Sequence, residues 1–450
     1  MSERKFELDK QTLADLSIFS NFAGDISVLS LFDQAKTIGG GDKLTEIFKH
    51  PLTNSEQIEQ RIECIKYLAN SDTGLSFNRE QCDYIEFYLT QQPKPVSFSK
   101  IRAIEKKALY FFNGDNDYYV IIRGIENTLH LLKMLDDFIS TADFNELPKL
   151  LRDFHSVIRT SMEDQDFQFV HGLFIKKQLS AVDIAKADHL FRYLGYERLK
   201  VLLDIVYQLD VFTSVGKLAK SNDFSFPVIN KTGEQVLRLQ GVFHPFIKDA
   251  VTNDVAFNHD KNVCFVTGAN MAGKSTLLKA IAISVFLSQL GFPVPAAYME
   301  TSVFEGLITT INLTDNILSG NSHFYSEVSR VKHVATKMSS TQNMLVIFDE
   351  LFRGTNVKDA YDASLAIISA FSKLRKSFFI ISTHIVEVAH ELAAIENINF
   401  KYLETIFDND TPTYNFQLKD GITEERLGMW IVKNEGIVEI IEGIVKQTDL

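Results

Sequence analysis

The chain has 450 residues, 45% of them hydrophobic and 23% charged, which is enough apolar material for a substantial core and room for roughly two to four domains. The net charge of −12 excludes a uniformly basic nucleic-acid surface but leaves a local basic patch open. No apolar run approaches the roughly 18 residues of a membrane span, there is no signal-peptide core, and the three cysteines are scattered, so we expect a reduced, cytoplasmic protein without a membrane partner.

Residues 1–225 are predicted to form a helical domain, because Leu, Ile, Phe and Tyr recur there at three- and four-residue spacing. These stripes indicate packing between helices and no chemistry of their own. The clearest stretches are Ile58–Leu68, Tyr118–Ile139 and Leu190–Leu209. Breaks are expected at Gly39-Gly40-Gly41, at Pro93-Lys94-Pro95 and near Pro148.

The pattern changes near Ser221–Pro227, after which short apolar runs alternate with helical patterns. Residues 226–450 are therefore predicted to form an α/β domain, with a mostly parallel sheet flanked by helices. The predicted strands are Val236–Leu239, Val263–Thr267, Leu307–Ile311, Leu345–Phe348 and Phe378–Ser382. The predicted helices are Thr276–Leu290, His323–Met338, Asp359–Leu374 and Ile385–Ile395.

The first of these strand-to-helix connections contains G-x-x-x-x-G-K-S, the sequence of a phosphate-binding P-loop. Backbone N–H groups and the helix N-terminus would surround a phosphate, Lys274 would reach the β- and γ-phosphates, and Ser275 would ligate Mg²⁺. A glycine-rich turn that happens to contain a lysine is the alternative interpretation. The predicted nucleotide-binding residues are Gly268, Ala269, Asn270, Met271, Ala272, Gly273, Lys274, Ser275 and Thr276.

Three later segments supply further candidates. Ser322 is a candidate N-cap of the helix that follows Gly320, and such a helix N-terminus can also receive a phosphate bound by a partner subunit. The apolar strand from Leu345 ends in two acids, of which Asp349 would hold Mg²⁺ and Glu350 would orient or activate water. A solvated turn is the alternative for this pair. His384 follows another strand and would contact a γ-phosphate, with a purely structural role as the alternative.

Together these residues resemble the motifs of the MutS family of DNA mismatch-repair ATPases, a branch of the ABC ATPase class. The segment from Thr267 resembles T-G-P-N-M-G-G-K-S-T, and the segment from Asp349 resembles D-E-x-G-R-G-T-S. Ser382-Thr383-His384 resembles A-T-H, and the segment from Ser319 resembles S-G-x-S-T-F. His244-Pro245 is similar to the entry to the family's ATPase domain. The helical half is more weakly similar to the family's core and lever domain, domain III.

The chain also departs from the family pattern at several positions. Ala269 and Ala272 replace Pro and Gly in the P-loop, outside the required glycines. Phe352 replaces a Gly after the paired acids, which puts the loop geometry there in question. The aromatic residue on one face of adenine falls near Ala250, whereas Phe416 falls at the His that stacks on the other face, and a Phe can still stack.

The resemblance implies ATP and Mg²⁺ as cofactors and ATP hydrolysis as the activity. ABC-type ATPases bind ATP between two subunits. By resemblance Lys274, Ser275 and Asp349 would hold MgATP, Glu350 and His384 would lie at the γ-phosphate with Lys274, and Ser322 would come from the partner. A homodimer is expected, with a helical dimerisation segment at the C-terminal end.

The resemblance further implies helical levers that move on duplex or branched DNA, in DNA repair or recombination. The chain leaves no room for the mismatch-reading, connector and clamp domains and has no G-x-F-Y-E-like wedge, so we do not expect a direct mismatch reader. Two alternatives stay open. One is an ATP-driven remodeller of RNA, ribosomes or protein, and the other is a nucleotide-gated dimeric scaffold with negligible turnover.

Overall fold

The structure is a computed structural model that describes residues 5–20, 25–71, 73, 75–90, 116–269, 271–311, 323–383, 385–408, 411–423, 432 and 434–448. The chain forms two compact units. Unit 1 comprises Met1–Val28, Pro51–Ser55 and Asn222–Leu450, and unit 2 comprises Leu29–His50 and Glu56–Ser221. The sequence predicts one boundary, between residues 225 and 226, whereas in the structure the N-terminal segment belongs to unit 1.

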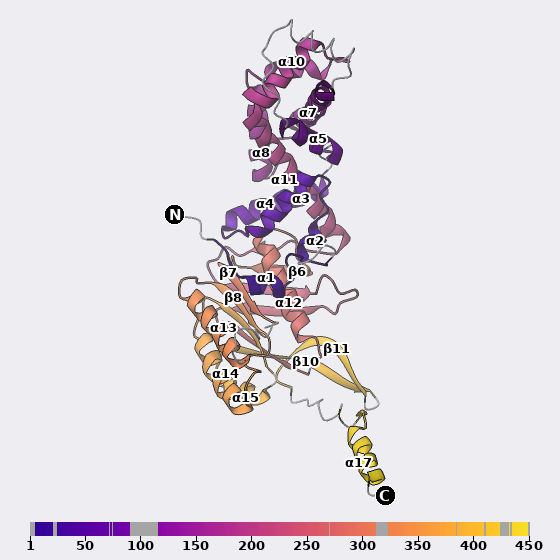
Figure 1. Cartoon of the computed structure of the whole chain (residues 1–450). Coiled ribbons are helices and arrows are strands. Elements are labelled where there is room, and N and C mark those ends of the chain that lie inside the picture. The colour runs from indigo at the N-terminus through magenta and orange to yellow at the C-terminus, as the bar shows by residue number, and fades with distance from the viewer. Residues whose placement is uncertain are drawn as a thin grey trace. The chain divides into compact units, whose positions relative to one another are not determined.

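Unit 1 is built on a seven-stranded sheet with the order β1-β7-β8-β9-β5-β10-β11 (Figure 1). Neighbouring strands are parallel except at the β10–β11 pair. The strands are β1 (Glu7–Leu8), β5 (Val263–Gly268), β7 (Gly306–Thr310), β8 (Met344–Phe348), β9 (Phe378–Ser382), β10 (Ile398–Asp408) and β11 (Thr411–Asp420). The mostly parallel sheet agrees with the predicted fold class of this part of the chain.

Helices cover both faces of this sheet, which explains why its central strands are continuous apolar runs. One face packs on α13 (His323–Met338), α14 (Val357–Phe371) and α15 (Val386–Leu392), which lie side by side in Figure 1. Phe371 of α14 stacks on Phe348 and Phe379, with ring centroids 5.8 and 5.0 Å apart. The helix α12 (Lys274–Gln289) contacts the sheet too, through β5, β7 and β8.

A second sheet of four strands, in the order β2-β6-β3-β4, completes unit 1. Its strands are β2 (Val228–Ile229), β3 (Val236–Val242), β4 (Asn253–Asn258) and β6 (Tyr298–Thr301). Phe257 of β4 stacks on Phe378 of β9 at a centroid distance of 5.4 Å, which joins the two sheets through buried aromatic rings. Two further helices, α1 (Lys10–Asp15) and α17 (Ile437–Thr448), also belong to this unit.

The described elements of unit 2 are helices. They are α3 (Ile38–Lys49), α4 (Ser55–Asn70), α5 (Arg79–Thr90), α7 (Asn116–Thr141), α8 (Lys149–Glu163), α9 (Gln168–Phe174), α10 (Ala181–His189), the π-helix η1 (Leu190–Leu194) and α11 (Tyr196–Ser221), preceded by α2 (Val28–Phe32) at the boundary. The break predicted near Pro148 is confirmed, because Pro148 is the N-cap of α8. The break at Pro93-Lys94-Pro95 lies outside the described residues.

One local prediction for unit 2 is wrong. Gly39-Gly40-Gly41 does not break a helix but forms the first turn of α3, where Thr37 is the N-cap and its hydroxyl accepts a hydrogen bond from Gly40 N at 3.0 Å. A Cβ at Gly39 would lie 2.4 Å from the ring of Tyr207 on α11, so close packing explains the small residue. The stretch Leu190–Leu209 is helical as predicted, and Gly195 divides it into η1 and α11.

Candidate active site

The loop between β5 and α12 has the backbone shape that its glycines predict. Gly268 and Gly273 have φ of +144° and +96°, and Gly273 is the N-cap of α12. Met271, between them, also has a positive φ of +73°. Because side chains other than Gly are strained in this region, the loop is held in a specific conformation by its surroundings. Asn270 lies outside the described residues.

Lys274 opens α12 and turns back into the loop. Its ammonium donates hydrogen bonds to the carbonyl oxygens of Gly268 at 2.8 Å and Ala269 at 3.0 Å. The residue is 5% exposed, and this burial lowers the pKa of Lys274, although Glu350 and Asp349 act in the opposite direction. A buried cation whose hydrogen bonds go to two carbonyl groups is poised to accept an anionic ligand in the loop.

The two acids predicted after β8 lie beside this loop. The hydroxyl of Ser275 donates a hydrogen bond to one oxygen of Asp349. Asp349 is itself fixed to the edge of β7, because its N–H donates to the carbonyl of Thr310 at 2.9 Å. Glu350 has a left-handed φ of +56°, and its carboxylate accepts a hydrogen bond from Arg353 at 2.9 Å.

These groups fit a divalent cation bound together with a phosphate. A serine hydroxyl and a carboxylate are hard oxygen donors of the kind that Mg²⁺ prefers, and Mg²⁺ commonly takes its other ligands from phosphates and water. Ser275 and Asp349 are in contact, so both side chains are close enough to bind the same cation. Elsewhere in the described ranges, no group of three or more His, Cys, Asp or Glu side chains is arranged to hold a metal ion.

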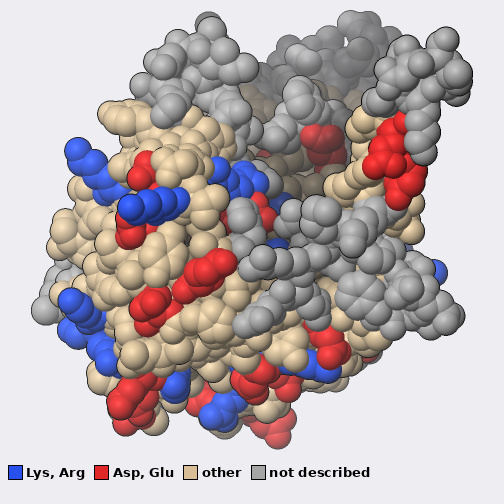
Figure 2. All heavy atoms as spheres, turned by 90° about the horizontal axis from the view of Figure 1, so that it is seen from below, with Lys and Arg blue, Asp and Glu red and all other residues tan. Residues whose placement is uncertain are grey.

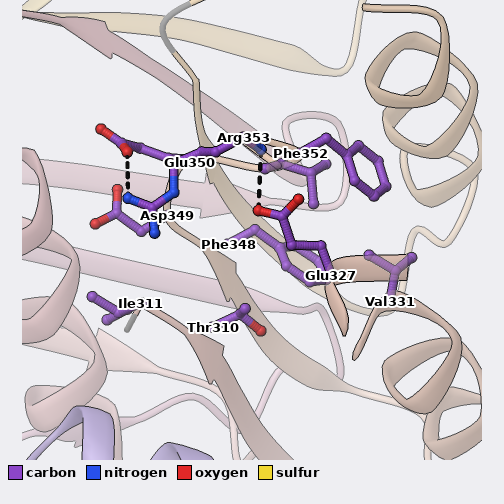
Figure 3. A pocket seen from close by; sticks show the side chains of 10 residues that line it. Thr310, Ile311, Glu327, Val331, Phe348, Asp349, Glu350, Phe352 and Arg353 are labelled. Carbon is purple, nitrogen blue, oxygen red and sulfur yellow. Dashed lines mark hydrogen bonds and ion pairs between the residues drawn. The ribbon is translucent and has the colours of Figure 1, made fainter. Parts of the chain in front are cut away.

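The loop after the acids is fastened to α13 by a buried carboxylate (Figure 3). Glu327, 5% exposed, accepts hydrogen bonds from the N–H of Arg353 at 3.0 Å and of Gly354 at 3.1 Å. Phe352 has a φ of +61° and is buried against Phe324 of α13, edge to face at 5.7 Å. The Phe that replaces a family Gly therefore packs into the core, in a backbone conformation that a Gly would adopt without strain.

A cavity of about 380 Å³ adjoins the P-loop on the side of the second sheet. Phe416 of β11 lines this cavity, and so does Ala250, near which the resemblance puts the family's second adenine-stacking residue. Phe416 lies next to the P-loop, since a Cβ on Gly273 would be 3.1 Å from its ring. Asn253 fixes this part of β11 by donating to Phe416 O at 3.0 Å and accepting from Leu418 N at 2.6 Å. The other lining residues are Val242, Phe243, His244, Ile247, Lys248, Asp249, Val251, Met271, Thr276, Leu277, Ala280 and Leu403.

Comparison with known proteins agrees with this geometry. The family model MutS domain V matches residues 264–448, from β5 to the last described helix. The DNA mismatch repair protein MutS of Petrotoga mobilis is 28% identical over 259 residues, which cover 56% of this chain and 31% of the relative. This chain is a MutS-like protein.

Other relatives match over the same share of the MutS-like chain. The DNA mismatch repair protein MutS of Geobacillus kaustophilus is 29% identical over 250 residues, or 53% of this chain and 27% of the relative. The DNA mismatch repair protein MSH3 of Candida glabrata is 29% identical over 252 residues, or 54% of this chain and 24% of the relative. The chain thus matches less than a third of the length of each of these relatives. MutS domain V is a P-loop ATPase domain, as the sheet and the loop described above indicate.

The structure of the MutS-like chain brings most of the predicted site residues together. Lys274, Ser275, Asp349 and Glu350 lie around the P-loop, and Phe416 lines the cavity beside it. Ser322, His384 and Asn270 lie outside the described residues, so their predicted roles stay predictions.

None of the helices in the described ranges is long and apolar enough to cross a membrane.

The sequence did not predict three residues of this site: Glu327, Asn253 and Ser382, whose hydroxyl donates a hydrogen bond to Asp349. Glu327 carried a signal, because it shares a helical face with the buried Val331 and Val334, and a charge on an apolar face indicates a buried partner. Ser382 differs from the Ala of the family's A-T-H, which marks it as unusual without assigning a contact. Asn253 carried no signal, since its hydrogen bonds to β11 reach residues more than 160 positions away.

Proposed function

We propose that this MutS-like chain binds MgATP in the P-loop and hydrolyses it. The direct hydrogen bond between Ser275 and Asp349 is the observation that carries the proposal, because it brings together the two side chains that would ligate Mg²⁺. Lys274 would exchange its two carbonyl partners for the β- and γ-phosphates. The backbone from Gly268 to Thr276 would supply N–H groups to the phosphates, and His384 would contact the γ-phosphate.

Glu350 would orient the attacking water and accept its proton. The carboxylate now accepts a hydrogen bond from Arg353, so Arg353 must release it, or share it, before the carboxylate can face a water molecule. Phe416 would stack on the adenine base inside the cavity that it lines. Bound Mg²⁺ would neutralise charge that develops on the phosphate oxygens.

The site would act between two copies of the chain, with Ser322 of one copy at the nucleotide of the other. Support comes from the resemblance to ABC-type ATPases and from α17, which presents a row of exposed apolar side chains that a helical dimerisation segment would bury. Ile440 and Ile441 are 61% and 55% exposed. ATP binding would close the dimer, hydrolysis would reopen it, and the helices of unit 2 would serve as levers.

Duplex or branched DNA is the proposed partner, and the names of the relatives, which describe DNA mismatch repair, support DNA. On the face shown in Figure 2, Lys and Arg side chains are interspersed with Asp and Glu side chains, so the described residues there form no concentrated basic stripe. A DNA contact would then depend on other surfaces and would weaken steeply as salt is added.

Steady-state ATP turnover of the purified chain tests the DNA proposal, with duplex, mismatched and four-way-junction DNA added separately at low salt. Stimulation by one DNA form supports a DNA-coupled ATPase and identifies the structure that it prefers. Turnover that none of the three forms alters contradicts the DNA proposal and points to RNA or protein as the partner. ATP binding without turnover would instead support the nucleotide-gated scaffold.

A further inference from the structure

Ser382 occupies a central place in the candidate site. It ends β9, which lies between the P-loop strand β5 and the acid-pair strand β8 in the sheet. Its side chain is fully buried at 0% exposure. The hydroxyl donates a hydrogen bond to Asp349 and accepts one from the N–H of Glu350 at 2.9 Å. One hydroxyl therefore contacts both members of the acid pair.

The contact with Asp349 fixes the direction of its carboxylate. Ser382 holds the Oδ1 atom, and the other oxygen, Oδ2, accepts the hydrogen bond from Ser275. A carboxylate that is held at one oxygen presents the second in a defined direction. Hydrogen-bond partners of this kind orient metal ligands, and their loss commonly costs 10- to 100-fold in metal affinity or activity.

The contact with Glu350 stabilises an unusual backbone. Glu350 has a φ of +56°, which a residue with a Cβ rarely adopts and which the surroundings must therefore enforce. Ser382 provides two restraints on this turn, because its hydroxyl accepts from Glu350 N and its carbonyl accepts from Leu351 N at 3.2 Å. The backbone conformation of this turn sets the position from which the Glu350 side chain extends.

We infer that Ser382 is a positioning residue that orients Asp349 towards the cation of a bound nucleotide and fixes the backbone of Glu350. This role rests on the proposed MgATP site. The family pattern that the segment resembles has Ala at the position of Ser382, so the hydroxyl is not part of that pattern. The sequence shows only a polar residue at the end of an apolar strand. The contact of Ser382 with Asp349 and Glu350 depends on how β8 pairs with β9.

The test measures how strongly binding of a non-hydrolysable ATP analogue depends on Mg²⁺, using equilibrium titrations of the full chain and its variants. Ser382→Ala is expected to raise the Mg²⁺ concentration for half-maximal binding about tenfold. Ser377→Ala is the matched control: Ser377 is buried at the other end of the same strand pair, and its hydroxyl accepts from Met344 N at 3.1 Å. We expect that control to leave the Mg²⁺ dependence unchanged.

A double-mutant cycle separates positioning from a general loss of structure. If Ser382 acts through Asp349, Ser382→Ala adds little to the Mg²⁺ requirement once Asp349→Asn is present, whereas an effect that adds in full in that background overturns the assignment. An unchanged Mg²⁺ requirement in Ser382→Ala alone overturns it too. Absence of Mg²⁺-dependent binding in the unmodified chain is a different result, because it overturns the proposed nucleotide site itself.

Discussion

The hydroxyl of Ser275 donates a hydrogen bond to the carboxylate of Asp349, although 74 positions separate the two residues in the sequence. The contact is possible because α12 begins at the carboxyl end of β5 while Asp349 follows the parallel strand β8, so both residues lie at the same edge of the sheet. This edge is where open α/β sheets bind their ligands.

Lys274→Met should abolish nucleotide binding and yet stabilise the nucleotide-free protein. Loss of a cation that binds phosphate would weaken ATP binding by about 2–5 kcal/mol. Burial lowers the pKa of Lys274, so the charged side chain disfavours the folded state at neutral pH. Thermal unfolding without nucleotide should therefore show a higher midpoint for the variant.

The lowered pKa of Lys274 also determines how the stability difference between Lys274→Met and the unmodified chain depends on pH. The cost of the charge is present below the folded-state pKa of Lys274 and disappears as the pH rises through that pKa to the ordinary value of 10.5. The gain of Lys274→Met should therefore shrink over this window. A lower midpoint for the variant at neutral pH, or ATP affinity equal to that of the unmodified chain, would contradict the account of Lys274.

Phe416→Ala should weaken ATP binding by about 1–3 kcal/mol, because a base that stacks on an aromatic ring loses that contact. Phe416 lines the cavity beside the P-loop and is 43% exposed, so its removal should cost little stability. Equilibrium binding of ATP measures the effect. Phe87→Ala is the control, since Phe87 is a similarly exposed Phe of unit 2 at 48%. Equal ATP affinity in both variants would contradict the proposal that Phe416 stacks on the adenine base.

Asp9→Asn should destabilise unit 1 at neutral pH. Asp9 accepts hydrogen bonds from Arg330 of α13 and from Thr12 N at 2.8 Å. Burial acts to raise the pKa of Asp9, but these bonds outweigh it and the pKa lies below its ordinary value of 3.8. The stabilisation is therefore complete above 3.8 and is lost as the pH falls through the folded-state pKa.

The expected loss for Asp9→Asn is about 1.5–3 kcal/mol in the free energy of unfolding, the usual range for a hydrogen bond to a charged group. Glu7→Gln serves as the control, because Glu7 forms a more exposed ion pair with Lys337 of α13, at 2.7 Å, that should contribute less than about 1 kcal/mol. Denaturant unfolding at neutral pH compares the two. If Asp9→Asn lowered the free energy of unfolding less than Glu7→Gln, the hydrogen bonds of Asp9 would not have the stabilising role given to them here.

Gly354→Ala should destabilise the chain by about 1–3 kcal/mol, because a Cβ there would lie 2.5 Å from the His323 ring and 2.6 Å from Phe324 N. The backbone of α13 cannot yield as a flexible side chain would. Gly172→Ala in α9 meets no atom within 4 Å and should instead raise stability by about 0.4–1 kcal/mol. Unfolding midpoints of the two variants should therefore shift in opposite directions, and a neutral Gly354→Ala would show that the loop is not packed on α13.

The strands of the nucleotide site were predictable because they are buried on both faces. β5, β8 and β9 are continuous apolar runs bounded by polar residues, and the predicted ranges match the structure within a residue or two. Strands at or next to the edges of the sheet were missed for the opposite reason. β1 has only two residues, and β10 alternates apolar and polar side chains as far as Tyr402, so neither stands out as an apolar run.

The contacts between segments were not predictable from one sequence. The motifs identify Lys274, Ser275, Asp349 and Glu350 by residue type, but the bridge through Ser382 depends on the register of two strands. The predicted break at Gly39-Gly40-Gly41 is wrong, because glycines commonly signal a break, whereas here Gly39 allows α3 to approach Tyr207. At such positions tertiary packing overrides the low helix propensity of glycine.

The most direct test of the central claim is the rate of Mg²⁺-dependent ATP hydrolysis by the purified chain and by Glu350→Gln. Removal of a general base commonly costs 10²- to 10⁴-fold in rate. We predict measurable turnover by the unmodified chain and a rate at least about 100-fold lower for Glu350→Gln, with ATP still bound. Full turnover in Glu350→Gln would contradict the role given to the acid pair.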